Sequence, residues 1–228
     1  MKATPLDYLL SSLCITLLLG LSLGGVALLL PWSRAWFADY HVLADLVLAL
    51  LLYGLLSALG VRLLLALRPI PDGSHGQDSV VFTQWKLVTI VYRLGQSALK
   101  PLTPIFLKPP VEAMYGARIG ADVALGGVID DPYKVTIGAG SVLGNASLVS
   151  GNYISGGMLV CGSVRIGAGV TVGANSVVFP DVEIGDGATL VGGSYVMPGT
   201  RIPAGETWRG NPARKWIQTA GRAASPAE

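Results

Sequence analysis

The chain has 228 residues, of which 51% are hydrophobic and 13% are charged, and its formal net charge is +2. The charged fraction is about half that of a typical soluble domain, and the deficit is concentrated near the N-terminus. A net charge this small gives no indication of nucleic-acid binding, so no such partner is expected.

Two apolar stretches open the chain. No charged residue lies between Asp7 and Arg34, a run long enough to cross a bilayer core of roughly 30 Å. A second apolar stretch runs from about Leu43 to Leu67. We therefore predict a two-helix transmembrane anchor over residues 1–68. A cleaved signal peptide is the alternative for the first stretch, but the run is too long and lacks a small-x-small cleavage site.

Positive charge predicts the orientation of this anchor. The loop between the two stretches holds one basic residue, Arg34. The segment after the second stretch holds Arg68, Lys86, Arg93, Lys100 and Lys108. Because basic residues stay on the cytoplasmic side, we expect a two-pass protein of the inner (cytoplasmic) membrane, in contact with membrane lipid. Both termini and the C-terminal domain should then be cytoplasmic.

Residues 69–115 are predicted to be a linker and an interfacial helix. A turn-rich segment, 69–77, precedes Asp78, which can cap a helix running to Lys100. That helix has a narrow polar stripe and a broad apolar face, a pattern typical of an amphipathic helix lying in the bilayer surface. The alternative is a helix packed on the membrane pair or on the C-terminal domain. The prolines between Pro101 and Pro110 predict an extended segment.

A period of six residues defines the next domain, residues 116–217. A branched aliphatic residue recurs at Ile166, Val172, Val178, Ile184, Leu190, Val196 and Ile202. Neither a helix nor a single strand produces this period, whereas a hexapeptide-repeat β-helix requires it. We predict a mainly β domain with four to five coils of 18 residues, because one coil cannot bury its aliphatic residues alone.

The repeat register contains one irregularity. Ile137 follows Ile119 by 18 residues, which is three hexads, but Ile166 follows Ile137 by 29, one short of five hexads. This slip predicts a protruding loop around residues 150–157, where Tyr153 and Ser155 are candidates to line a cleft. The small, polar tail, 218–228, is predicted to be disordered.

Several segments carry a family resemblance. Ile166-Gly-Ala-Gly-Val-Thr and Ile184-Gly-Asp-Gly-Ala-Thr resemble the bacterial hexapeptide-repeat acyltransferases, whose fold is a left-handed parallel β-helix. The segment Trp208-Arg-Gly-Asn-Pro-Ala-Arg-Lys215 resembles their closing segment, and residues 129–138 are similar to a region of sugar O-acetyltransferases. The layout of helices before Gly116 is also similar to the C-terminal membrane part of poly-amino-acid synthetases of the non-ribosomal type.

The resemblance implies acyl transfer from acetyl-CoA or another acyl-CoA to a hydroxyl or amine. In this family the reaction takes place in a cleft between subunits of a homotrimer, and a histidine is the usual general base. The sequence departs from that pattern, because its two histidines, His41 and His75, both lie outside the repeat. The family's histidine is expected near the register slip, at about Gly151 or Asn152.

Replacement catalytic residues are therefore sought in the repeat domain. Asp130 and Asp131 are adjacent carboxylates, and burial can make one of them a base, although Asp-Asp-Pro also suits a solvated turn. Asn145 and Asn152 can orient an acceptor, although asparagine also suits β-helix corners. Cys161 fits a buried structural cysteine better than a nucleophile, and its pairing with a cysteine in the predicted membrane helix is implausible.

The candidates for cofactor binding follow the last coil. Arg209, Arg214 and Lys215 can pair with the phosphates of CoA, or can be a solvated basic tail. No metal site is predicted, because a zinc hydratase built on such a fold needs about three imidazoles. The favoured function is a membrane-anchored acyltransferase acting on a membrane-proximal or cell-envelope acceptor. The alternative is a catalytically inactive trimeric scaffold that organises membrane helices or a partner enzyme, so enzymatic activity stays open.

Overall fold

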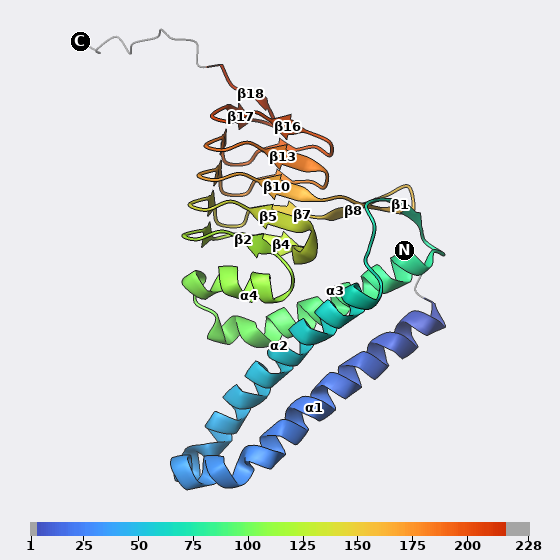
Figure 1. The fold of residues 1–228 in the computed structure, drawn as a ribbon, viewed down its shortest axis with the longest axis vertical. Helices are drawn as coiled ribbons and strands as arrows, with labels where there is room; N and C mark the ends of the chain where they lie inside the picture. Colours follow the sequence, from blue (N-terminus) through green and yellow to red (C-terminus); the bar gives the residue numbers. More distant parts are fainter. Residues whose placement is uncertain (1–3, 218–228) are drawn as a thin grey trace, which may run out of the picture.

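A computed structural model of the protein describes residues 4–217. Figure 1 shows a stack of short strands with all the helices at one end and β18 at the other. The first two helices are α1 (Pro5–Phe37) and α2 (His41–Leu67), joined by a 3-10 turn, η1 (Ala38–Tyr40). The predicted tail, 218–228, lies outside the described residues.

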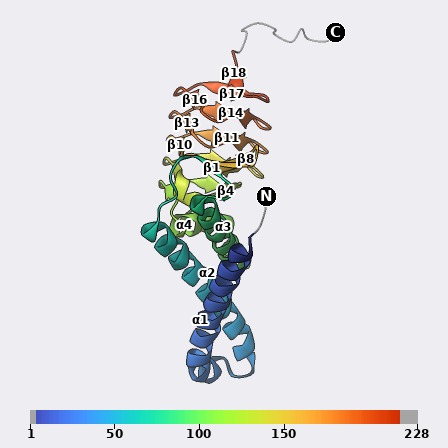
Figure 2. The same ribbon diagram turned by 90° about the vertical axis from the view of Figure 1, so that its right-hand side faces the viewer.

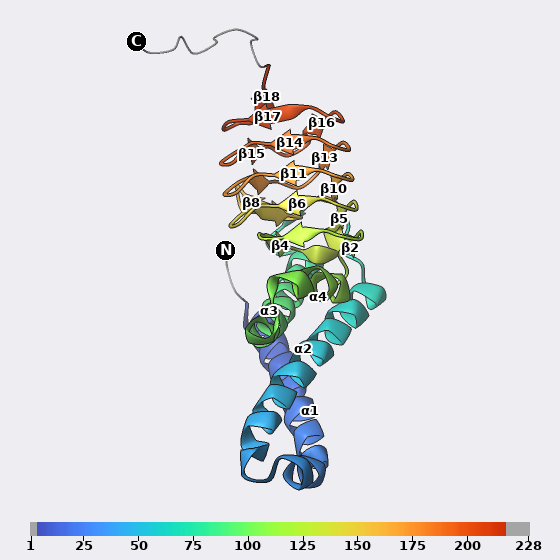
Figure 3. The ribbon, with the colours of Figure 1, turned by 90° about the vertical axis from the view of Figure 1, so that its left-hand side faces the viewer.

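Helices α1 and α2 form an antiparallel hairpin that projects away from the strands (Figures 2 and 3). Thr4 and Asp7 cap the start of α1 reciprocally, and the Ser22 hydroxyl in its middle donates to the Ala49 carbonyl of α2 at 2.8 Å. The helical segment Pro5–Leu67 is long and apolar enough to cross a membrane, and only 11% of its most apolar window is buried. The number of spans and the orientation stay predictions.

Helix α3 (Val80–Leu99) lies between the hairpin and the strands. Its cap is Ser79 rather than Asp78, because the Ser79 hydroxyl accepts from the Phe82 N–H at 3.1 Å. The apolar face of α3 is buried by protein, with Phe82 and Val91 at most 2% exposed. The prediction of a helix lying in the bilayer surface is therefore wrong, and its packed alternative is correct.

Close approach fixes α3 against α2. A Cβ at Gly95 would lie 1.7 Å from the Ser57 hydroxyl and 2.4 Å from that of Tyr115, so only glycine fits there. Those two hydroxyls are themselves hydrogen-bonded at 2.7 Å. The polar stripe predicted from sequence consists of Lys86, Thr89, Arg93, Gln96 and Lys100. Its first residue, Lys86, is buried and ion-paired with Asp7 of α1.

The proline-rich segment is helical, so the predicted extended conformation is wrong. Its elements are η2 (Lys100–Leu102), η3 (Ile105–Leu107) and α4 (Lys108–Met114). Proline is compatible with the first turn of a helix, where its missing N–H has no partner to lose. Helix α4 packs beside the first coil and carries the buried Glu112.

Three parallel sheets form a β-solenoid of about five turns. One sheet contains β2 (Arg118–Ile119), β5 (Val135–Ile137), β10 (Val164–Ile166), β13 (Val182–Ile184) and β16 (Arg201–Ile202). The second contains β3 (Ala124–Leu125), β6 (Val142–Leu143), β11 (Thr171–Val172), β14 (Thr189–Leu190), β17 (Thr207–Arg209) and, antiparallel, β18 (Arg214–Lys215). The third contains β4 (Val128–Asp130), β7 (Leu148–Ser150), β12 (Val177–Val178) and β15 (Tyr195–Val196).

The six-residue period corresponds to the solenoid core. Ile119, Ile137, Ile166, Ile184 and Ile202 are direct partners in successive strands of the first sheet, forming one column of stacked side chains. All but Ile119 are at most 3% exposed. The repeat prediction is confirmed, and the handedness of the coil stays a prediction.

A protruding hairpin absorbs the register slip, as expected from the sequence. It consists of β8 (Asn152–Ser155) and β9 (Met158–Cys161), which pair antiparallel. The linker strand β1 (Gly73–Gly76) adds to the outer edge of β9, which places His75 opposite Leu159. The linker is thus part of the folded domain, and one 3-10 turn, η4 (Pro132–Lys134), marks the irregular coil below it.

Candidate functional site

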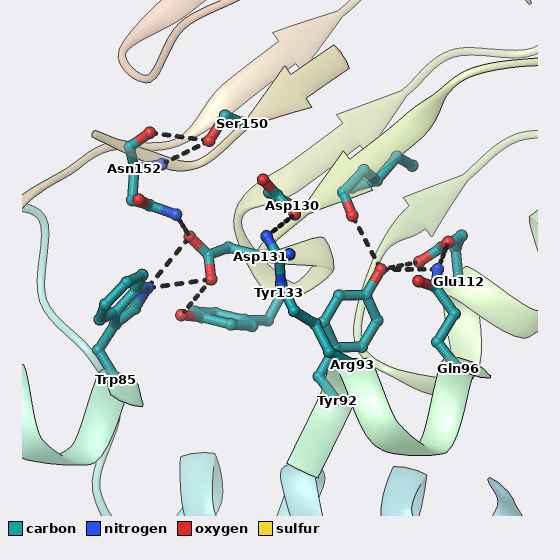
Figure 4. A network of polar contacts seen from close by, with 11 residues as sticks. Trp85, Tyr92, Arg93, Gln96, Glu112, Asp130, Asp131, Tyr133, Ser150 and Asn152 are labelled. Carbon is teal, nitrogen blue, oxygen red and sulfur yellow. Dashed lines mark hydrogen bonds and ion pairs between the residues drawn. The ribbon is translucent and has the colours of Figure 1, made fainter. Parts of the chain in front are cut away.

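The main polar cluster lies where α3 meets the first two coils (Figure 4). Trp85, Tyr92 and Gln96 are seven and four residues apart, so they share the face of α3 that points toward the solenoid. Two carboxyl groups receive hydrogen bonds from this face: Asp131 of the irregular coil and Glu112 of α4.

Asp131 is enclosed by hydrogen-bond donors. Its Oδ1 accepts from the Trp85 indole N–H at 3.3 Å and from the Tyr133 hydroxyl at 3.1 Å, and Asn152 donates its amide to Oδ2. The residue is 4% exposed, and burial raises the pKa of its carboxyl. Asp131 adopts φ +55°, a left-handed conformation that aspartate tolerates better than most residues. The cluster ties α3, the coil and β8 together.

Glu112 is also 4% exposed, but it lies on the wall of a cavity of about 180 Å³. Burial raises the pKa of its carboxyl to about 7, against the opposing effect of hydrogen bonds from Tyr92 and Gln96. The same cavity is lined by Lys100 and Lys108. The arrangement is a carboxyl poised to exchange a proton near neutral pH beside two ammonium groups.

A single tyrosine proton has two acceptors in this cluster. The Tyr92 hydroxyl lies 2.9 Å from Glu112 Oε2 and 2.8 Å from the carbonyl oxygen of Ile129 in β4. When Glu112 is protonated, the tyrosine proton is free for Ile129; when Glu112 is ionised, the carboxylate competes for it. The protonation state of Glu112 is therefore linked to a contact between α3 and the first coil.

The structure brings together some of the predicted catalytic residues and separates others. Asp131 and Asn152 are in direct contact, although 21 residues separate them. Asp130 instead forms an ion pair with Arg93 of α3 at 3.0 Å, so the two neighbouring carboxylates have different surroundings. Asn145 is exposed at the corner between β6 and β7, where it is Ala146 that has a positive φ.

The remaining candidates are also placed. Cys161 is buried and free, and burial raises the pKa of its thiol to about 12, which suits a structural cysteine rather than a nucleophile. Tyr153 contacts Phe179 edge-on beside a cavity that it lines together with Cys161. His75 belongs to β1, and one of its ring nitrogens lies 3.1 Å from the Pro71 carbonyl oxygen.

The predicted cofactor-binding residues lie at the far end of the solenoid from Glu112. Arg209 stacks over the Trp216 ring at 4.7 Å, and Lys215 pairs with Glu206 at 2.5 Å. Arg214 is exposed, and one guanidinium N–H donates to the Ala213 carbonyl at 3.0 Å.

Sequence reasoning missed Glu112. It lies in a segment expected to be extended, and its chemical character comes from burial by α3. The available signal was Lys108-Pro-Pro-Val-Glu112, in which proline follows a residue able to begin a helix.

No protein-family model and no curated protein sequence matches this chain. Several solved structures are similar to it in part. They include a hexapeptide-repeat-containing acetyltransferase from Vibrio cholerae in complex with acetyl coenzyme A (23% identity, 45% of this chain and 60% of that chain, TM-score 0.42). A galactoside acetyltransferase in complex with coenzyme A is 20% identical, over 50% of this chain and 70% of that chain, with a TM-score of 0.42. A maltose O-acetyltransferase from Clostridium difficile is 16% identical, over 68% of this chain and 95% of that chain, with a TM-score of 0.44. The likeness concerns the fold alone, and the chain spans about 60% of the Vibrio protein's length.

Proposed function

We propose that this protein is a membrane-anchored acyltransferase in which Glu112 replaces the histidine base implied by the family resemblance. The observation that carries the proposal is the Glu112 carboxyl, with a pKa of about 7, on the wall of a cavity that two lysines share. A base works best when its pKa is near the operating pH. The cavity, about 180 Å³, fits the reacting end of an amine or hydroxyl acceptor better than a whole acyl-CoA.

The proposed reaction transfers an acyl group from a thioester. The acceptor nitrogen or oxygen attacks the thioester carbonyl carbon while Glu112 takes the acceptor's proton. The carbon–sulfur bond then breaks, the thiolate leaves, and Glu112 returns the proton to it. Lys100 and Lys108 would stabilise the negative charge that develops on the carbonyl oxygen.

Acyl-CoA is the proposed donor, since the repeat resembles CoA-dependent acyltransferases and two of the similar structures hold CoA or its acetyl ester. Arg209, Arg214 and Lys215 lie at the opposite end of the solenoid, so they can reach the CoA phosphates only if the donor lies along a sheet face. Asp131 and Asn152 are proposed to position α3 rather than to react. A homotrimer is proposed from the resemblance.

The anchor is proposed to be a two-pass hairpin in the cytoplasmic membrane. Its support is the exposure of its leucines, among them Leu28 (83%) and Leu67 (85%), which water would not favour. The exposed apolar turn η3, with Phe106 73% exposed, would also contact lipid. The active site would then lie close to the bilayer, and its acceptor would be a membrane-proximal or cell-envelope compound.

The test uses the full chain in phospholipid nanodiscs with acetyl-CoA and a panel of amine and sugar acceptors, measuring release of free thiol. We expect turnover to rise with pH through about 7, and Glu112→Gln to lower it by roughly a hundredfold or more. Glu206→Gln, the same change on a half-buried glutamate at the far end of the solenoid, is the control. Absence of saturable acyl-CoA binding would overturn the proposed acyltransferase function. Full activity of Glu112→Gln together with loss of activity in His75→Ala would show that His75 of β1, and not Glu112, is the general base.

A scaffold is the second candidate, and one observation favours it. The carboxyl that the sequence pointed to, Asp131, is enclosed by three donors that hold α3 to the solenoid. Such a rigid joint suits a hub that organises membrane helices or a partner enzyme. This alternative predicts no turnover with any thioester and a stoichiometric partner that co-purifies from membranes.

A further inference from the structure

A second cavity lies on the other side of the joint between the helices and the solenoid. Its volume is about 380 Å³, and its apolar wall includes Leu65, Pro69 and Ile70 at the end of α2. The opposite wall is the outer face of the first sheet, where Arg118, Thr136 and Arg165 line it.

These three side chains form one outward-facing column. Arg118 is paired with Thr136 in the neighbouring strand, and Thr136 is paired with Arg165 in the next. Adjacent strands lie about 4.8 Å apart, so the two arginines are about 10 Å apart with a hydroxyl between them. Two guanidinium groups at this spacing can close on a single phosphate and donate to several of its oxygens.

The charges around the cavity leave it basic. Lys134 and Asp72 neutralise each other through an ion pair of 2.5 Å, and Arg165 also reaches Glu183 at 2.8 Å. Arg118 is exposed and has no acidic partner among residues 4–217. An arginine left without a partner beside another arginine is a favourable place for an anion.

The position of the cavity indicates where such an anion comes from. The apolar exposed surface of α2 continues to Leu67, and the cavity begins at the same end of the helix. Basic pockets directly beyond the end of a membrane helix are suited to anionic headgroups.

We propose that Arg118, Thr136 and Arg165 form a binding site for a phosphate group, supplied by an anionic phospholipid headgroup. The lipid source rests on the proposed membrane anchor, whereas phosphate binding does not. An occupied site would hold the solenoid at a fixed height and rotation above the bilayer, since it joins the sheet face to the end of α2.

The test compares nanodiscs of phosphatidylcholine alone with nanodiscs that also contain phosphatidylglycerol. Native mass spectrometry measures the phosphatidylglycerol retained per protein after detergent extraction. We expect preferential retention by the wild type and a loss of roughly tenfold for Arg118→Ala and for Arg165→Ala. Arg201→Ala is the matched control, because Arg201 lies in the same column two strands beyond Arg165 and away from α2.

A second arm identifies the source of the phosphate. Binding of glycerol 1-phosphate to the protein in phosphatidylcholine nanodiscs, lost in Arg118→Ala, would support the phosphate site but replace the lipid by a soluble ligand. Equal retention of phosphatidylglycerol by wild type and both variants, without glycerol 1-phosphate binding, would overturn the proposal. Carbonate extraction of the same variants reports on membrane insertion separately, so a failed anchor and a failed phosphate site are distinguishable.

Discussion

Glu112→Gln gives opposite predictions for stability and activity, which makes it the most informative single change. In the folded protein the pKa of Glu112 is raised from 4.5 to about 7. Between these values the folded state keeps a proton that the unfolded state has lost, so stability falls as the pH rises through that window. Ionisation, which the proposed catalysis requires, therefore costs stability.

The magnitude follows from the shift. A difference of about 2.5 pKa units corresponds to about 3 kcal/mol at a pH above both values. Glutamine keeps the shape and an acceptor for Tyr92 but cannot ionise. At about pH 8 we therefore expect Glu112→Gln to unfold several degrees higher than the wild type, and at about pH 4 to unfold at a similar temperature. The pKa of Asp131 is also raised, so its titration lowers stability with rising pH equally in the wild type and in Glu112→Gln.

The assay is thermal unfolding of the detergent-solubilised chain, followed by tryptophan fluorescence across this pH range. Glu206→Gln is the control, because the ion pair with Lys215 lowers the pKa of the half-buried Glu206 and keeps its titration below the window. If the unfolding temperatures of wild type and Glu112→Gln change in parallel between about pH 5 and pH 8, the raised pKa of Glu112 is refuted, and with it the proposed base.

Three further changes test the packing that creates the site. Asp131→Ala removes the acceptor of three side-chain donors, one of them the buried Trp85 indole, and places alanine at a positive φ, so we expect a loss of about 3 kcal/mol in unfolding free energy and a red shift of tryptophan fluorescence. Gly95→Ala introduces a Cβ 1.7 Å from a hydroxyl of α2 and should separate α3 from the hairpin, visible as faster amide exchange in α3; Gly24→Ala, with nothing within 4 Å, should not. Ile184→Ala empties part of the solenoid core and should cost about 2–5 kcal/mol by denaturant titration, whereas the exposed Val142→Ala should cost well under 1 kcal/mol. Equal effects within either matched pair would contradict the packing described.

Burial at the joint between helices and solenoid could not be predicted from sequence. The carboxyl of Glu112 accepts hydrogen bonds from Tyr92 and Gln96, which belong to a different helix. The Tyr92 hydroxyl in turn lies within hydrogen-bond distance of the Ile129 carbonyl in the first coil. The sequence separations between these contacting residues do not repeat along the chain. A pKa set mainly by burial depends on how those elements dock, and local sequence does not encode docking.

The position of His75 was unpredictable for the same reason, because it depends on how separate elements dock. The sequence places His75 in a turn-rich linker, and only pairing between β1 and β9 brings it beside the protruding hairpin. Asp131 and Asn152 were identified individually, because they flank the irregular coil and the register slip. Their direct contact became evident only from the stacking of those segments.

The solenoid, its core and its protruding hairpin were predictable from sequence alone. Most coils pack on a neighbour 18 residues away, three sides of six residues each, so the buried aliphatic recurs every six residues; the one 29-residue spacing, from Ile137 to Ile166, marks the hairpin. Length and composition also show that the segment Pro5–Leu67 is apolar enough to cross a membrane. Three features became visible only in the folded protein: the apolar face of α3 is buried by protein, Asp131 is enclosed by hydrogen-bond donors, and Glu112 faces a cavity. Those features arise where two unlike units meet once, and a contact made once leaves no period in the sequence.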